Sequence, residues 1–352
     1  MNGLSVASLL LILTTHTTIC RCEDGFITWD DLHLGRTTSF DGGGGERVIV
    51  VDKRGKGDSS TVRGALDMVP DGNPARVKIF LFPGIYREKV VVPITKPYVT
   101  FIGNDSANTV ISWNARASDR SSDGGYVGTL DSATFAVEAE YFCAKGITFE
   151  NTSPNAKPGA KGMQAVALRV SADKAMFLDC RILGSQDTLF DHNGRHYFLD
   201  CFIQGSIDFI FGDAKSLYQV CLFKQECTLH SVATSYGAIA ASQRNSTMQD
   251  SGFSFFHCRL NGHGSLYLGR AWGRHATVVY SFCELDGIVI PQGWDDWGDP
   301  SRRRTAWFGE FECTGRGAYL SERVPWAKSL TYDEARPFLD LNYIDGDQWL
   351  RL

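Results

Sequence analysis

Phe177-Leu178-Asp179-Cys180 recurs 21 residues later as Phe198-Leu199-Asp200-Cys201, and the likeness continues through the ten residues after each copy. Those ten residues carry Gly184-Ser185-Gln186-Asp187 in the first copy and Gly205-Ser206-Ile207-Asp208 in the second. A short β-rich unit that recurs about every 20 residues is typical of a β-solenoid, whose coils bury their apolar faces only against one another. A β-sandwich is the alternative, but it would not explain a nearly identical unit at a fixed offset.

Other segments fit the same all-β solenoid. Degenerate copies of the unit end in Cys143, Cys221, Cys258 and Cys283, and short apolar runs at 47–51 and 98–102 read as strands. One helix is expected after Ser59-Ser60-Thr61, because Val62, Leu66 and Val69 then share a face before Pro70. We expect this short helix to cap the N-terminal end of the core and the tail after Thr331 to pack along the outside.

Composition excludes several classes of protein. The 352 residues carry 35 Lys+Arg and 40 Asp+Glu, a formal net charge of −5, so nucleic acid is not an expected partner. Hydrophobic residues make up 43 %, which argues against a disordered chain. No stretch after the first 25 residues is long and apolar enough to span a bilayer, so no membrane partner is expected.

The N-terminus predicts export. Residues 6–13 form a short apolar run, so we expect a signal peptide at 1–22, an N-terminal extension at 23–45 and one β-solenoid domain at 46–352. Sequons at Asn104, Asn151 and Asn245 are candidate glycosylation sites, and the protein is expected to be secreted.

The cysteines suggest disulfides, as they do in many exported proteins. Cys221 and Cys258 lie 37 residues apart, as do Cys143 and Cys180, and each pair flanks an insertion between coils. We predict the bridge Cys221–Cys258 and, with less support, Cys143–Cys180. The pairing Cys180–Cys201 stays open, because these two residues stack in adjacent coils. The alternative to disulfides is that several cysteines are simply small buried residues.

The repeat also predicts chemistry. Asp187 and Asp208 occupy the same position in consecutive coils, and stacked coils lie about 4.8 Å apart. Two carboxyls that close cannot both ionise cheaply, so one pKa should rise while the other stays low. Such a pair can supply a general acid and a nucleophile. The competing reading is a pair of aspartates in solvated turns.

Five motifs resemble those of the pectin methylesterases (pectinesterases). They are residues 84–88 (GIYRE), 164–168 (QAVAL), 186–189 (QDTL), 208–212 (DFIFG) and 268–272 (LGRAW). They occur in the family's order and are followed by Pro291-Gln292-Gly293-Trp294. The resemblance implies a single-stranded right-handed parallel β-helix and hydrolysis of the methyl esters of homogalacturonan.

The resemblance also implies a role for each residue. Asp208 resembles the nucleophile, Asp187 the general acid and base, and Arg270 the residue that keeps Asp208 ionised and oriented. Gln164 and Gln186 resemble the amide donors to the oxyanion. The expected sugar-binding residues are Trp272, Trp294, Phe211, Tyr86 and Gln164. Glu88 is expected to have a structural role.

Some readings remain open. Ala271 stands where many relatives have Pro, which could loosen the turn that carries Arg270 and Trp272. The short stretch before the first strand resembles the form without an inhibitory pro-domain.

No metal or cofactor is expected. The expected partners are methyl-esterified homogalacturonan and, as a further candidate, a proteinaceous pectinesterase inhibitor. The protein is expected to be a monomer. The alternatives are another β-helix pectin enzyme, a lyase or polygalacturonase, and a non-catalytic wall-polysaccharide binder.

Overall fold

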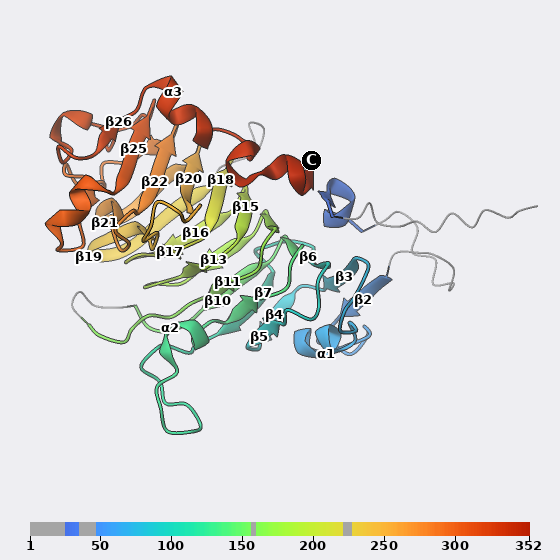
Figure 1. The fold of residues 1–352 in the computed structure, drawn as a ribbon. Coiled ribbons are helices and arrows are strands. Elements are labelled where there is room, and N and C mark those ends of the chain that lie inside the picture. The colour runs from blue at the N-terminus through green and yellow to red at the C-terminus, as the bar shows by residue number, and fades with distance from the viewer. Residues whose placement is uncertain (1–24, 35–46, 156–159, 221–226) are drawn as a thin grey trace, which may run out of the picture.

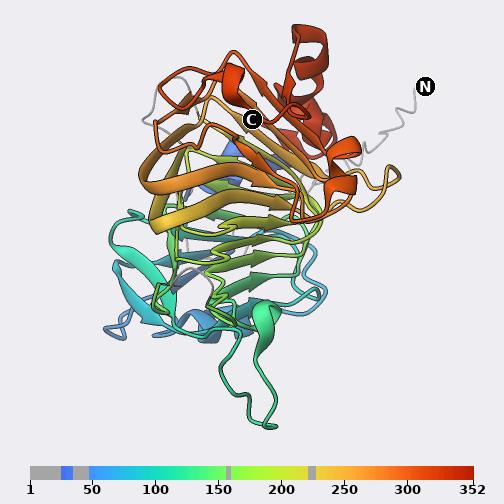
Figure 2. The same ribbon diagram turned by 90° about the vertical axis from the view of Figure 1, so that its left-hand side faces the viewer.

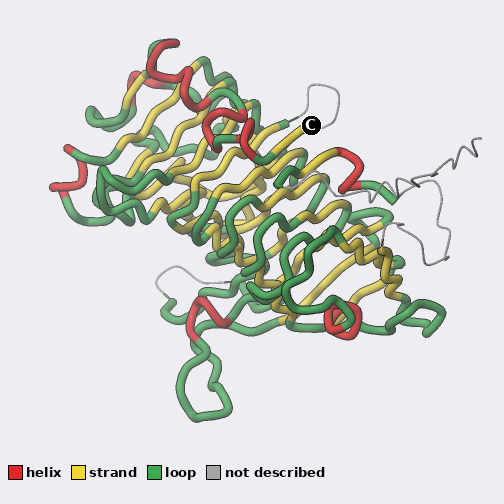
Figure 3. Tube along the Cα trace, turned by 45° about the vertical axis from the view of Figure 1, so that its right-hand side comes forward, coloured by secondary structure: helices red, strands yellow, loops and turns green. Residues whose placement is uncertain are grey.

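The computed structural model describes residues 25–34, 47–155, 160–220 and 227–352. Its strands pair in parallel and stack coil upon coil into a three-faced β-helix, so the predicted solenoid is confirmed (Figures 1 and 2). Helices are few and lie at the periphery of the stacked strands (Figure 3).

We name the three faces for what lies on them. The tail face contains β2 (Arg47–Val51), β3 (Val77–Leu81), β6 (Val99–Gly103), β9 (Cys143–Lys145), β12 (Ala175–Leu178), β15 (Arg195–Leu199), β18 (Lys215–Gln219), β20 (Gly252–Phe256), β22 (Thr277–Ser281), β25 (Trp307–Phe311) and β26 (Lys328–Ser329). The cavity face contains β5 (Val90–Val92), β8 (Phe135–Val137), β11 (Leu168–Val170), β14 (Leu189–Asp191), β17 (Ile210–Gly212), the second halves of β19 (Thr228–Ser242) and β21 (Arg259–Arg270), and β24 (Trp294–Asp295). The third face contains β4 (Gly84–Arg87), β7 (Thr109–Trp113), β10 (Thr148–Asn151), β13 (Arg181–Leu183), β16 (Phe202–Gly205), the first halves of β19 and β21, and β23 (Glu284–Leu285).

Like residues stack along the interior. Phe177, Phe198, Tyr218, Phe255 and Tyr280 form a continuous column in which successive ring centroids lie 4.9, 4.7, 4.7 and 4.5 Å apart. All five side chains belong to the main core, so each coil completes the burial of the next. The repeated Phe177 and Phe198 of the sequence are thus two steps of this column.

A cysteine column marks the corner between the tail face and the third face. Cys180, Cys201, Cys227, Cys258, Cys283 and Cys313 follow one another in successive coils and are free thiols. Where the preceding residue is described, its φ is positive, as at Asp179 with φ 52 and Asp200 with φ 53. That left-handed residue turns the chain, and the thiol then donates a hydrogen bond to a nearby carbonyl oxygen, as Cys201 does to Phe177 at 3.5 Å.

This column overturns one predicted disulfide. Cys143 and Cys180 are both free, because Cys143 packs in the cluster outside the tail face whereas Cys180 points into the core. Cys258 is likewise a free thiol, and its predicted partner Cys221 lies outside the described residues. The alternative partners Cys180 and Cys201 are also unbridged in the structure.

A short α-helix covers the N-terminal end of the β-helix core, as predicted. Helix α1 (Val62–Asp67) begins after Thr61, whose side chain accepts a hydrogen bond from the backbone N–H of Gly64, and buries Val62 and Leu66 in the core. The carboxylate of Glu88 accepts from the backbone N–H groups of Val62 at 2.9 Å and Arg63 at 3.0 Å. Glu88 therefore has the structural role expected of it.

The C-terminal tail packs along the outside of the tail face. It contains α3 (Tyr332–Ala335), the 3₁₀ helices η4 (Arg336–Phe338), η5 (Leu341–Ile344) and η6 (Gly346–Gln348), and β27 (Leu350–Arg351). β27 pairs in parallel with β1 (Ile27–Thr28), which leads into the 3₁₀ helix η1 (Trp29–Leu32). Part of the predicted N-terminal extension thus belongs to the same packed unit, and the rest of it, with the signal peptide, lies outside the described residues.

Two of the three predicted glycosylation sites are accessible. Asn104 and Asn245 are exposed, but Asn151 is 4 % exposed and its amide nitrogen donates to the carbonyl oxygens of Ala115 and Val166. A glycan cannot be attached at Asn151 in the folded chain, so this prediction is wrong.

In the part of the chain that the structure describes, no helix combines the length and apolar character needed to cross a membrane.

Candidate active site

A cavity of about 390 Å³ opens on the cavity face. It is lined by residues from neighbouring coils, which are Thr129, Gln164, Gln186, Asp187, Phe190, Asp208, Phe211, Ala241, Arg270, Trp272 and Trp297. Seven of these were predicted as catalytic or substrate-binding residues from the sequence. Thr129 belongs to the short helix α2 (Gly128–Asp131) at the edge of the cavity face (Figure 1).

The two aspartates stack as the repeat predicts. Asp187 and Asp208 each lie two residues before the first residue of β14 and β17, Leu189 and Ile210, and these two residues are in register. The N–H of Asp187 donates to the carbonyl of Ile207 at 3.1 Å. Both aspartates have left-handed backbones, with φ 60 and φ 44. Strain of this kind is common at functional sites, because the surrounding fold must hold it in place.

The glycine of each Gly-Ser pair makes this turn possible. A Cβ on Gly205 would lie 2.1 Å from the Cβ of Phe209, so only glycine allows the chain to fold back over the residue after Asp208. The serines that follow stack as well, since the hydroxyls of Ser185 and Ser206 lie 3.1 Å apart. The repeated Gly-Ser-x-Asp segment thus presents the two carboxyls in the same way in two successive coils.

Arg270 holds Asp208 through two hydrogen bonds. Its Nε donates to Oδ1 of Asp208 at 2.8 Å, and its Nη2 donates to Oδ2. The guanidinium carbon also lies 4.1 Å from the ring centroid of Trp297, so one face of the guanidinium is covered by an aromatic ring. This bidentate contact fixes the orientation of the Asp208 carboxylate and favours its ionised form.

The two carboxyls differ electrostatically. Burial raises the pKa of Asp187 well above its ordinary value, and the negative charge of Asp208 raises it further. Burial also raises the pKa of Asp208, but the hydrogen bonds and positive charge of Arg270 oppose that rise. The pair therefore retains a proton more readily on Asp187 than on Asp208.

The predicted amide donors line the same cavity. Gln186 hydrogen-bonds to the side chain of its neighbour Asp187. The Oε1 atom of Gln164 is buried without a hydrogen-bond partner among the described residues. This atom is an acceptor, so its partner would be a donor such as a sugar hydroxyl, whereas an oxyanion would accept from the amide nitrogen of Gln164.

An aromatic wall closes one side of the cavity. The rings of Phe190 and Phe211 stack with centroids 4.4 Å apart, Trp272 lies 6.1 Å from Phe211, and Trp297 lies 6.3 Å from Trp272. Trp297 was missed in the sequence analysis. Its signal was the turn that surrounds it, with Asp295 and Asp296 before it and Gly298 after it, because a tryptophan in such a turn is placed at the surface.

Two predicted sugar-binding residues lie elsewhere. Trp294 is 1 % exposed, stacks on Phe308 at 4.6 Å and donates to Glu310 at 3.3 Å. Tyr86 is also 1 % exposed, and its hydroxyl donates to the carbonyl of Phe82 at 2.8 Å. Both rings are core residues and have no free face for a substrate, so these two predictions are wrong.

The cavity suits acyl transfer in chemical terms. It combines an oriented carboxylate, a second carboxyl with a raised pKa, amides that can donate hydrogen bonds and aromatic rings. Among the described residues, no group of three or more His, Cys, Asp and Glu side chains could hold a metal ion.

Comparison with known proteins gives a consistent result. Residues 48–347 match the model of the Pectinesterase family. The chain is 58 % identical over 308 residues to Pectinesterase QRT1 of Arabidopsis thaliana, an alignment that covers 87 % of this chain and 79 % of that protein. The structure of pectin methylesterase from carrot superposes with a TM-score of 0.76 at 33 % identity, covering 87 % of this chain and 95 % of the carrot chain. A pectin methylesterase crystallised in complex with hexasaccharide VII has a TM-score of 0.72 at 25 % identity and covers 84 % of this chain and 96 % of its own.

Proposed function

Because the chain belongs to the pectinesterase family, we propose that it hydrolyses the C6 methyl esters of homogalacturonan to carboxylate and methanol, with Asp208 as the nucleophile. One observation carries this assignment. Asp208 is held by Arg270 through both carboxylate oxygens, beside a second buried aspartate, Asp187, whose pKa is raised well above its ordinary value by burial and by the charge of Asp208.

The first half of the reaction forms an acyl-enzyme. A carboxylate oxygen of Asp208 attacks the ester carbonyl, and the carbonyl π electrons move to its oxygen. When the tetrahedral intermediate collapses, the bond to the methoxy oxygen breaks and Asp187 gives its proton to the leaving methanol. The products of this step are methanol, an anhydride between Asp208 and the sugar, and an ionised Asp187.

The second half restores the enzyme. The ionised Asp187 takes a proton from water, and the resulting hydroxide attacks the sugar carbonyl of the anhydride. The bond to the Asp208 oxygen then breaks, which returns Asp208 as a carboxylate and Asp187 as an acid. In both halves the carbonyl oxygen becomes negative, and we assign the amide N–H groups of Gln164 and Gln186, which line the cavity, as donors to it.

The aromatic wall provides the binding surface. The half-buried Trp272 and the more exposed Trp297 present rings to the cavity, and such rings stack favourably against the apolar faces of sugars. The hexasaccharide complex of a structural neighbour supports an oligosaccharide substrate for this cavity. We further propose that the protein acts outside the cell on wall pectin, with Asn104 and Asn245 as its accessible sequons.

Methanol release from esterified homogalacturonan tests this proposal. Purified protein should release one methanol for each carboxylate formed, in the presence of a chelator as well as in its absence. Double-bond formation that a chelator abolishes would indicate a lyase, and chain cleavage without methanol a polygalacturonase. Binding of the polymer with neither reaction would indicate a non-catalytic binder.

A further inference from the structure

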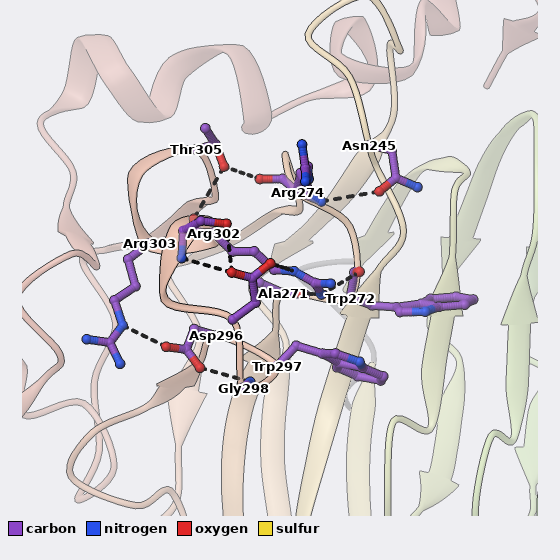
Figure 4. A network of polar contacts seen from close by, with 12 residues as sticks. Asn245, Ala271, Trp272, Arg274, Asp296, Trp297, Gly298, Arg302, Arg303 and Thr305 are labelled. Atoms are coloured by element: carbon purple, nitrogen blue, oxygen red, sulfur yellow. Dashed lines mark hydrogen bonds and ion pairs between the residues drawn. The ribbon is translucent and has the colours of Figure 1, made fainter.

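Arg302 joins the two segments that carry the aromatic wall. We call residues 270–274 the Trp272 turn and residues 295–305 the Trp297 loop. Arg302 lies in the 3₁₀ helix η2 (Pro300–Arg304) of the loop, and its Nη1 donates to the carbonyl oxygens of Ala271 at 2.5 Å and Trp272 at 2.7 Å (Figure 4). One guanidinium nitrogen therefore holds two successive carbonyl groups of the turn.

The Trp272 turn is tight and is held by backbone hydrogen bonds as well as by Arg302. The N–H of Trp272 donates to the carbonyl of Arg270 at 3.0 Å, which closes a three-residue turn around Ala271. The N–H of Ala271 donates to the carbonyl of Asp295 at 2.9 Å. A proline at 271 would lack that N–H, so the alanine adds a bond between turn and loop instead of loosening the turn.

The Trp297 loop is organised by its own aspartates. Oδ1 of Asp295 accepts from the N–H of Trp297 at 3.0 Å, and Asp299 caps η2 by accepting from the N–H of Ser301 at 3.0 Å. Arg302 also pairs with Asp299 through its Nε at 3.3 Å. Arg302 thus connects the cap of η2 in the loop to the backbone that supports Trp272.

We propose that Arg302 is a positioning residue that sets the separation of the Trp272 and Trp297 rings, and through it the affinity of the cavity for the sugar chain. The side chain of Arg302 is 19 % exposed and lies behind the wall, on the carbonyls of the turn, so it acts through the two rings. Figure 4 shows both rings extending in the same direction from the turn and the loop that Arg302 joins. The kinetic part of this inference rests on the proposed function.

The test compares Arg302→Gln with Arg304→Gln, since Arg304 is exposed on the same short helix. Loss of hydrogen bonds from a charged donor corresponds to roughly a tenfold change, so we expect KM for methyl-esterified hexagalacturonide to rise about tenfold in Arg302→Gln. We expect kcat to stay within about threefold, because the two hydrogen bonds from Arg270 to Asp208 do not involve Arg302. Arg304→Gln should keep the parental KM, and Arg302→Lys should recover part of it, because an ammonium group can still donate to both carbonyls.

Tryptophan fluorescence supplies a readout that does not need activity. The emission maximum should shift in Arg302→Gln and stay in place in Arg304→Gln, because only the first change frees the two rings. An unchanged KM together with an unchanged spectrum in folded Arg302→Gln would overturn the inference; if that variant does not fold, the same comparison is made with Arg302→Lys. If the parent protein releases no methanol, the proposed function fails, whereas the fluorescence comparison still decides whether Arg302 positions the rings.

Discussion

Asp187 and Asp208 show how two copies of one residue acquire different chemistry from their neighbours. Both are buried and both have left-handed backbones, so burial and backbone conformation alone do not distinguish them. The difference is Arg270, which donates two hydrogen bonds to Asp208. In the proposed mechanism, a single cation thus divides a symmetric pair into a nucleophile and an acid.

Replacement of Asp208 by Asn tests the nucleophile. The amide keeps the size of the side chain but cannot form the anhydride, so methanol release should fall by several orders of magnitude, more than the roughly 10²–10⁴-fold expected for loss of proton transfer in Asp187→Asn. Asp333→Asn, an exposed change in the first turn of α3, should keep the parental rate. If Asp208→Asn retained near-parental turnover while its circular dichroism matched the parent, the mechanism would be wrong.

The pH profile of methanol release should be bell-shaped. The proposed mechanism requires Asp208 without its proton and Asp187 with it, so the rate should rise as pH passes the pKa of Asp208 and fall as it passes that of Asp187. Burial raises both pKa values, most strongly for Asp187, so the active range should lie above the region near pH 4 where ordinary aspartates titrate. A profile that stays flat from acid to alkaline pH, measured where circular dichroism shows a folded protein, would exclude a shared proton.

At the scale of elements, the sequence predicts which residues stack in successive coils and which face of the short helix is buried. The 21-residue offset placed Asp187 over Asp208, and the capped apolar face of α1 was visible as Thr61, Val62 and Leu66. A repeat conveys which residues share a position along the coil, because register follows from the stacking itself.

The repeat does not convey which way a side chain points at the end of a strand. The indole of Trp294 points into the core, where its N–H donates to the carboxylate of Glu310 on β25. Arg323 also donates to that carboxylate. Trp297, three residues later, faces the cavity. The sequon at Asn151 fails for a similar reason, since the carbonyls that bury its amide come from other coils.

Glu88 provides a prediction for a single element. Its carboxylate binds two N–H groups at the start of α1, and loss of such a cap costs about 0.5–2 kcal/mol, so Glu88→Ala should lower the free energy of unfolding by about that amount. Glu140→Ala, at an exposed position, should leave it within about 0.5 kcal/mol of the parent. Urea denaturation measures both, and equal effects of the two changes would show that the cap does not stabilise the helix.

At the scale of the molecule, function and tail occupy different faces. The cavity lies over β14, β17 and the second halves of β19 and β21, whereas the C-terminal tail covers the outer surface of β9, β12, β15 and β18. The tail buries Trp349 completely, and its indole N–H donates to the carbonyl of Ile344 at 2.9 Å. Because β27 also pairs with β1, both ends of the described chain contribute to one apolar cluster.

This separation predicts that stability can be lost without a change in chemistry. Trp349→Ala should lower the free energy of unfolding by about 3–5 kcal/mol, as truncation of a fully buried aromatic side chain usually does. The folded fraction should keep the parental KM and kcat, since the cluster around Trp349 lies on the tail face and the cavity lies on a different face of the β-helix. Tyr319→Ala is the matched control, because Tyr319 is 67 % exposed and its truncation should cost less than about 0.5 kcal/mol. Chemical denaturation with initial rates at a temperature where both variants are folded measures the two effects, and a loss of kcat in folded Trp349→Ala would show that the tail supports the active site through the core.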